Sequence, residues 1–348
     1  FAYLALARLH FQRTQDEKAL AVLRQGAKDP RKTPAILGLC FSQAREFITN
    51  GEISRAIPCF QIMVQHSPGQ RSQFYNVLGE LYEGLGYDDE AIRSFTLATQ
   101  ETSPLPDSFV KLALLQLKSD PDRSLETLLR ADRLVPDTPA ILFLLGYVYS
   151  RQERPADAIG VYDRILPLLE ETAPEKIPPT FYLFYGGACE RTGKFEKAET
   201  IFEKCLKRFP DNDEVLNYLA YMWAERGVKL DQAEAYVTRA LAAEPNNGAY
   251  IDTLGWIYYR QKKYNEALEQ IRKASEIVKD DAVVTDHLGD VFSALDDQAQ
   301  AASCWKRSFL LDPKNKAVGD KLRAQGVNVD QLRKEAPKAD RQAATDGK

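Results

Sequence analysis

The amino-acid sequence predicts an all-α protein, a right-handed solenoid or superhelix of about nine helix hairpins that ends in a C-terminal capping helix. Three observations support this prediction. A small residue recurs about every 34 residues, a bulky residue follows it three positions later, and glycine or proline stands where each helix should end. A regular period of this length is typical of repeat architectures, in which each unit packs only on its neighbours.

The small residue marks the first helix of each hairpin. Two helices can cross closely only where one of them lacks a bulky side chain, which explains why alanine or glycine recurs there. The nine markers are Ala7, Ala44, Gly79, Ala113, Gly146, Gly186, Ala220, Gly255 and Gly289. Small residues on the second helices serve the same contact, and they are Ala19, Ala56, Ala91, Ser124, Ala158, Ala198, Ala233, Ala267 and Ala301.

Larger residues fill the space between the hairpins. Those three positions after the markers are His10, Phe47, Tyr82, Gln116, Tyr149, Cys189, Trp223, Tyr258 and Phe292. A second bulky set on the second helices includes Phe60, Phe95, Tyr162, Phe202, Ile271 and Trp305. We interpret both sets as core, because aromatic residues at helical spacing usually pack between helices.

Turn residues agree with this register. Glycine tolerates a left-handed backbone, so it is expected to end first helices, and proline cannot continue a helix, so it is expected to end second helices. The glycines are Gly51, Gly86, Gly193 and Gly227, and the prolines are Pro68, Pro136, Pro210, Pro245 and Pro313.

Two copies of the pattern lie end to end in residues 213–279: "DEVLNYLAYMWAERGVKLDQAEAYVTRALAAEP" and "GAYIDTLGWIYYRQKKYNEALEQIRKASEIVK". Their succession of small, aromatic and small residues resembles the tetratricopeptide repeat, a helix–turn–helix of about 34 residues. The resemblance covers roughly Ala2 to Pro313. The sequence of these two copies is similar to that of bacterial repeat proteins, which are often envelope-associated adaptors. This resemblance implies a bacterial source, and it favours the envelope or periplasm slightly over the cytoplasm. The cysteines favour a reducing compartment instead.

The period also predicts how the chain is divided. We expect an N-terminal array over residues 1–165, a C-terminal array over residues 181–313, a capping helix over 314–327 and a polar tail over 328–348, mobile past about Ala336. The spacing of 40 between Gly146 and Gly186 indicates an insertion at 166–180, which is a longer second helix, a loop or a joint. Because Phe1 lies in mid-helix without a methionine, we expect that the chain was cut or processed there.

Composition and motifs argue against several functions. The net charge of −4 provides no basic field for nucleic acid, and no apolar run approaches the length of a membrane span. The three histidines are far apart, and phosphate-binding, dinucleotide-binding and zinc-protease motifs are absent, so we expect no enzyme, cofactor or metal site. The five cysteines are interpreted as buried small hydrophobes, with a Cys189–Cys205 link as the alternative.

The remaining chemistry is recognition. In a curved array the first helices line the inner groove, and positions three before and one, four and five after each marker point into it. The candidate partner-binding residues at these positions are Phe143, Tyr147, Arg151, Glu190, Arg191, Asn217, Tyr221, Glu225, Asp252, Trp256, Tyr259, Arg260, Asp286 and Asp290.

Three aromatic residues dominate this set. Tyr221, Trp256 and Tyr259 are costly to expose to water unless a partner covers them, although they could instead pack laterally on adjacent first helices. Asn217 is suited to holding a peptide backbone through its amide. The acidic residues Asp252, Asp286 and Asp290 argue against a free C-terminal carboxylate as ligand and favour a basic or neutral segment.

We therefore predict a non-enzymatic scaffold or adaptor, most simply a monomer, that binds a peptide or partner helix in its groove. Two alternatives stay open. The chain could be the interaction arm of a larger enzyme or of a secretion or assembly machine, or a structural array that self-associates through its first repeat.

Overall fold

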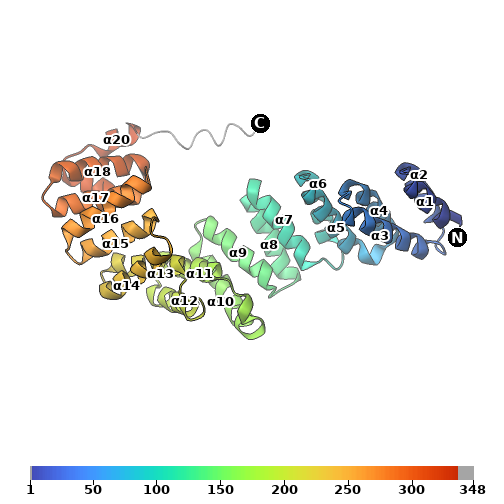
Figure 1. Cartoon of the computed structure of the whole chain (residues 1–348), viewed down its shortest axis with the longest axis horizontal. Coiled ribbons are helices and arrows are strands. Elements are labelled where there is room, and N and C mark those ends of the chain that lie inside the picture. Colours follow the sequence, from blue (N-terminus) through green and yellow to red (C-terminus); the bar gives the residue numbers. More distant parts are fainter. Residues whose placement is uncertain (1, 336–348) are drawn as a thin grey trace. The chain divides into compact units, whose positions relative to one another are not determined.

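The computed structural model describes residues 2–335, and all regular secondary structure in that range is helical (Figure 1). The chain divides between Ile177 and Pro178 into two compact units. Within each unit the hairpins follow one another in sequence order, and the second helix of one hairpin packs against the first helix of the next.

The first unit holds five hairpins. They are α1 (Ala2–Gln12) with α2 (Asp16–Gly26), α3 (Thr33–Thr49) with α4 (Ile53–His66), α5 (Arg71–Gly84) with α6 (Asp88–Gln100), α7 (Pro106–Ser119) with α8 (Pro121–Leu134), and α9 (Pro139–Arg151) with α10 (Pro155–Thr172). Two short 3₁₀ turns accompany them, η1 (Pro68–Gln70) and η2 (Pro174–Lys176).

The second unit holds four hairpins and two further helices. They are α11 (Pro179–Arg191) with α12 (Phe195–Arg208), α13 (Asp213–Arg226) with α14 (Leu230–Ala243), α15 (Gly248–Arg260) with α16 (Tyr264–Ile277), α17 (Ala282–Ala294) with α18 (Gln298–Leu311), and then α19 (Lys316–Ala324) and α20 (Val329–Glu335). The prediction of nine hairpins and a capping helix is confirmed for the part of the chain that the structure describes.

The marker residues lie where the two helices of each hairpin approach most closely. All nine markers are buried. A Cβ atom added to Gly79 would lie 2.5 Å from the ring of Phe95, and one added to Gly289 would lie 2.5 Å from the ring of Trp305. Because real Cβ atoms do not approach other atoms so closely, glycine is the residue that lets the bulky side chain of the second helix fill this position.

The turns also follow the prediction. Gly51, Gly86, Gly193 and Gly227 have positive φ angles between 67° and 77°. Each of the five prolines stands two residues after the last residue of a second helix, as Pro245 does after α14. Backbone chemistry at the turns and packing between the helices therefore specify the same register.

The insertion lengthens a helix and precedes the division between the units. Helix α10 has 18 residues, longer than any other second helix in the described range, and continues to Thr172 before η2. The boundary of the two units, at Ile177, falls inside the segment 166–180. Of the three alternatives for this segment, a longer second helix is observed, and it is followed by a short loop.

Two helices cover the end of the second unit, where the sequence predicted one. Val318 and Leu322 of α19 and Val329 and Leu332 of α20 are buried in one cluster with Phe309. The start of the predicted polar tail is therefore helical, because two apolar residues three positions apart form one buried face. The segment past Ala336, which was expected to be mobile, lies outside the described residues.

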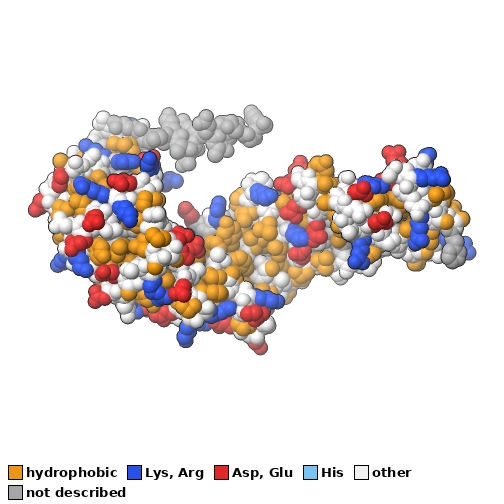
Figure 2. Space-filling view, viewed as in Figure 1, with side chains coloured by type: hydrophobic (Ala, Val, Ile, Leu, Met, Phe, Trp, Pro, Cys, Tyr) orange, Lys and Arg blue, Asp and Glu red, His pale blue; other side chains and the backbone are white. Residues whose placement is uncertain are grey.

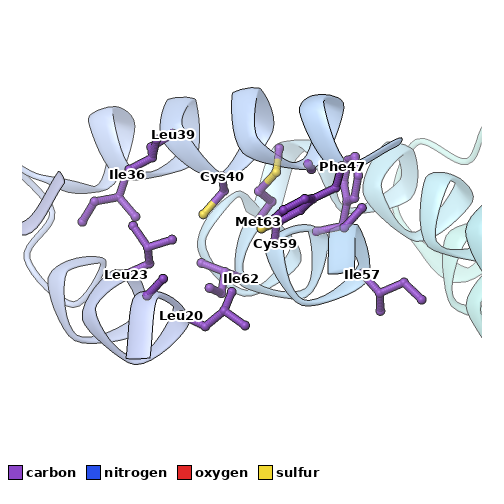
Figure 3. Close-up of a cluster of buried hydrophobic side chains, with 14 of the residues drawn as sticks. Leu20, Leu23, Ile36, Leu39, Cys40, Phe47, Ile57, Cys59, Ile62 and Met63 are labelled. Carbon is purple, nitrogen blue, oxygen red and sulfur yellow. The ribbon is translucent and has the colours of Figure 1, made fainter. Parts of the chain in front are cut away.

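Four of the five cysteines are buried in the core, and Cys304 is partly buried. All five have free thiols, and Cys189 and Cys205 are fully buried without being linked. Figure 3 shows Cys40 and Cys59 in the apolar cluster of the first unit, near Met63. Burial raises the pKa of both thiols to about 12, so they remain protonated and pack as small hydrophobes.

Two alanine substitutions in the fifth hairpin test the close approach of its helices. A Cβ at Gly146 would lie 2.6 Å from the ring of Tyr162, whereas a Cβ at Gly160 meets no atom within 4 Å. We expect Gly160→Ala to raise the free energy of unfolding by up to about 1 kcal/mol, because alanine favours helix. Gly146→Ala should lower it by about 1–3 kcal/mol, because the tyrosine ring must shift. Urea unfolding followed by circular dichroism measures both, and stabilisation by both variants would contradict the packing.

Candidate partner-binding face

The first helices of the second unit lie side by side, with α13 in contact with α11 and α15, and α15 in contact with α17. We call their shared surface the first-helix face. Its polar and aromatic residues are Glu190, Asn217, Tyr218, Tyr221, Glu225, Asp252, Trp256, Tyr259, Asp286, His287 and Asp290. Nine of these eleven residues were predicted from the sequence, and Tyr218 and His287 were not.

Trp256 is at the centre of an aromatic stack. Its ring lies 4.0 Å from the ring of His287 on α17, at an interplanar angle of 11°, and 4.6 Å from the ring of Tyr259, at 8°. Only 6% of Trp256 is exposed. The expectation that Trp256 is open to a partner is therefore wrong, because it packs laterally on the neighbouring first helix. Tyr221 and Tyr259 remain half-buried.

A buried ion pair lies under this stack. Nδ1 of His287 is 2.9 Å from Oδ2 of Asp252, and each residue is only 4% exposed. Burial disfavours the charged imidazole, but the neighbouring Asp252, with smaller effects from Glu225 and Asp286, raises the pKa of His287 above its ordinary value. Asp252 was predicted to contact a partner from the groove, and the structure places its carboxylate inside the face instead.

A lysine from the capping helix neutralises the other predicted acidic residues. Nζ of Lys321 on α19 lies 2.8 Å from Asp286 and 2.6 Å from Asp290, and it also lies 5.8 Å from the centre of the Trp305 ring. The indole N–H of Trp305 donates to Asp290 at 3.0 Å. The expectation that this end of the groove presents acidic charge to a partner is therefore wrong, because the chain supplies its own cation.

The α11–α13 part of the face has a different composition. The hydroxyl of Tyr218 reaches across to Gly187, where an added Cβ would lie 3.0 Å from it. Glu190 and Tyr221 are half-buried beside it, and Glu225 is exposed. Burial raises the pKa of Tyr218 to about 12, and Glu190 adds to the shift. Burial also raises the pKa of Glu190, assisted by Glu225 and opposed by Arg191 and Tyr218.

Three buried polar atoms of this face have no hydrogen-bond partner within the described residues. They are Oδ1 of Asn217, Oδ1 of Asp252 and Nε1 of Trp256. A buried polar atom without a partner costs about 1–3 kcal/mol and therefore requires an explanation. Since α13 and α15 are in contact, the three atoms belong to one region of the face.

The other predicted residues are not all brought together. Phe143, Tyr147 and Arg151 belong to α9 in the first unit, where Figure 2 shows apolar side chains gathered over α8 and α9. Arg191 is exposed at the end of α11. Arg260 donates to the backbone carbonyl of Glu225 at 2.8 Å, and its guanidinium lies 6.0 Å from the centre of the Trp256 ring.

Sequence reasoning missed Tyr218, His287 and Lys321. Tyr218 and His287 stand two residues before their markers, a position that was not counted as part of the groove. The period nevertheless contains the signal, because His287 and Asp252, like Lys321 and Asp286, are 35 residues apart. Residues separated by one repeat on successive first helices are neighbours, so complementary charges at that separation indicate contacts.

Two further features were sought within residues 2–335: a metal-binding cluster and a membrane-spanning helix. No group of three or more histidine, cysteine, aspartate or glutamate side chains in this range is placed to hold a metal ion. A search of the same range finds no helix with the length and apolarity that a membrane span requires.

An NMR titration of the histidines tests the buried ion pair. We expect His287 to titrate above the ordinary histidine pKa of about 6.5, and Asp252→Asn to lower its midpoint, because the substitution removes the carboxylate charge. Because the pKa of His287 is raised in the folded state, the pair makes its full contribution to the free energy of unfolding below about pH 6.5. This contribution is lost as the pH rises through the raised pKa. His287→Gln assigns the signal. A midpoint below 6.5 in the wild type, or one that Asp252→Asn leaves unchanged, would contradict the pair.

Comparisons with known proteins agree with the architecture. A family model described as "Tetratricopeptide repeat" matches residues 38–310. The BBSome complex member bbs-4 of Caenorhabditis elegans is 23% identical over 202 residues, which are 57% of this chain and 43% of the relative. The TPR repeat-containing protein PA4667 of Pseudomonas aeruginosa is 32% identical over 101 residues, 29% of this chain and 17% of the relative. The chain therefore spans less than half the length of these two curated relatives.

A solved structure supports the fold alone. A chain in the crystal structure of the APC/C hetero-tetramer Cut9-Hcn1 aligns with a TM-score of 0.54 and 14% identity, over 82% of this chain and 55% of that chain. The family model covers most of the sequence, and the nine hairpins carry the small markers and turn residues that the repeat requires. On this evidence, the chain belongs to the tetratricopeptide repeat family.

Proposed function

We propose that this chain is a non-enzymatic scaffold that binds an extended segment of a partner protein on the first-helix face of its second unit. The observation that carries the proposal is the row of half-buried tyrosines on neighbouring first helices, with Tyr218 and Tyr221 on α13 and Tyr259 on α15. Half-exposed aromatic residues on one face are the usual anchors of a binding surface.

Asn217 lies on the same helix as two of these tyrosines and is half-buried. A side-chain amide can both donate and accept, and an extended segment offers backbone N–H and C=O groups that can pair with it. The half-buried Tyr221 and Tyr259 stand on α13 and α15 and provide amphipathic contact area, which is the usual composition of binding hot spots.

The names of two relatives favour a role in assembly. The relatives described as a BBSome complex member and as subunit 3 of the anaphase-promoting complex are, by those names, parts of multiprotein complexes. Because the chain spans 43% and 20% of these relatives, we extend to it only the general role of a protein-binding scaffold within a larger assembly. The interaction arm of a larger machine therefore remains the second candidate, and it would use the same face.

Selection of peptides tests the proposal. We would select a phage-displayed library of random extended peptides on the whole chain and measure the affinity of the recovered peptides. Tyr218→Ala/Tyr221→Ala should weaken binding about tenfold or more, because it removes two aromatic contacts from the face. Ala242→Arg changes an exposed position on α14, the second helix of the same hairpin, and should have no effect.

The control separates the face from the rest of the surface. Circular dichroism must show equal helicity for both variants. Peptides that bind both variants as tightly as the wild type would place recognition elsewhere and contradict the proposal, as would a selection that yields no binding peptide.

A further inference from the structure

We infer that a cavity between α6, α7 and α8 of the first unit binds the carboxylate side chain of an aspartate or glutamate of a partner protein. This site is separate from the first-helix face and does not depend on the proposed function. The cavity has a volume of about 180 Å³. We call it the Gln116 cavity, and the side chains in its lining that can donate a hydrogen bond are Thr96, Gln100, Gln116, Arg123, Thr127 and Arg130.

The cavity lies where the fourth hairpin lacks a large side chain. Six of the nine hairpins carry phenylalanine, tyrosine or tryptophan three positions after the marker, whereas the fourth carries Gln116. In the third hairpin this ring reaches the preceding second helix, because the hydroxyl of Tyr82 accepts a hydrogen bond from Gln61 of α4 at 3.4 Å. Thr96, 35 residues after Gln61, lines the cavity at the same place in the next repeat. The missing ring therefore leaves room for a side chain from another molecule.

The lining of the cavity is polar. The hydroxyl of Thr127 donates to Oε1 of Gln116 at 2.7 Å, so the amide nitrogen of Gln116 remains as its donor. Gln100 adds a second amide from an exposed position. Of the described residues that line the cavity, Leu112 alone is apolar. An apolar occupant would leave these polar groups without partners, whereas a carboxylate accepts hydrogen bonds from them.

The guanidinium of Arg130 is held in place but not neutralised. Its Nη2 donates to the hydroxyl of Thr99 at 2.6 Å, and the guanidinium lies 5.3 Å from the centre of the Phe109 ring. Arg130 is partly buried, yet no carboxylate in the part of the chain that the structure describes forms an ion pair with it. Buried cations are usually paired. A carboxylate from a partner would supply the missing charge, in the planar geometry that a guanidinium matches.

The charge of the lining favours a carboxylate over a phosphate. Arg123 and Glu126 also line the cavity, both are exposed, and neither forms an ion pair within residues 2–335. Together with Arg130, they leave an excess of one positive charge. A single carboxylate balances this excess, whereas a phosphate dianion would exceed it and repel Glu126. The occupant that this lining selects is therefore an aspartate or glutamate side chain rather than a phosphorylated residue.

Nuclear magnetic resonance of the whole chain tests the inference, through the backbone amide signal of Thr127. The probe is a single glutamate residue blocked at both backbone ends with acetyl and methylamide groups, and the same compound of glutamine is its control. We expect the glutamate probe to shift the signal saturably. The glutamine probe should bind at least about tenfold more weakly, because it has the same shape without the charge.

Three variants locate the binding. Gln116→Tyr places in the cavity the ring that other hairpins carry, leaves both arginines in the chain, and should abolish the saturable shift. Arg130→Gln should weaken binding of the glutamate probe about tenfold. Arg133→Gln, at an exposed position of α8 outside the cavity, makes the same change in net charge and should leave binding unchanged. Circular dichroism shows whether each variant keeps its helicity.

Several results would overturn the inference. The glutamate probe could give no shift or no more than the glutamine probe, or inorganic phosphate could bind more tightly than the glutamate probe. Equal losses with Arg133→Gln and Arg130→Gln would show an effect of net charge alone. Binding retained by a helical Gln116→Tyr variant would place the site outside the cavity. Because the cavity and the first-helix face belong to different units, none of these results decides the proposed function.

Discussion

The close approach of two helices at one small residue is the constraint on which the rest of this structure depends. At Gly79, Gly146 and Gly289 there is no room for a single added carbon atom, because a ring from the second helix occupies the space. The position of this close contact fixes the rotation of each helix about its own axis. It therefore decides which residues of the first helix face the preceding hairpin and which form an exposed face. Repetition of this contact about every 34 residues aligns the exposed positions of successive first helices.

The hairpins could be predicted from the sequence, but the side-chain contacts between neighbouring hairpins could not. Markers, turn glycines and prolines act within one repeat, so their spacing could be interpreted directly. Contacts such as those of His287 with Asp252 and of Lys321 with Asp286 join residues 35 positions apart, and they depend on side-chain direction at positions the pattern does not specify. For the same reason Trp256, expected to be open to a partner, packs against a neighbouring helix. Helix α20 was missed because only Val329 and Leu332 signal its buried face.

The first-helix face of the second unit has two parts that differ in how far their side chains are enclosed by the chain. Between α15 and α19, Trp256 stacks on His287, and Lys321 pairs with Asp286 and Asp290. On α11 and α13, Glu190, Tyr218 and Tyr221 are half-buried and Glu225 is exposed. Contacts within the chain hold the first part, which positions the second for the binding that we propose.

A crystal structure of the chain with a bound peptide tests the central claim of this account most directly. We predict that the peptide lies across α11, α13 and α15, with a backbone group near Asn217. Binding only along the second helices or at α1 would contradict it.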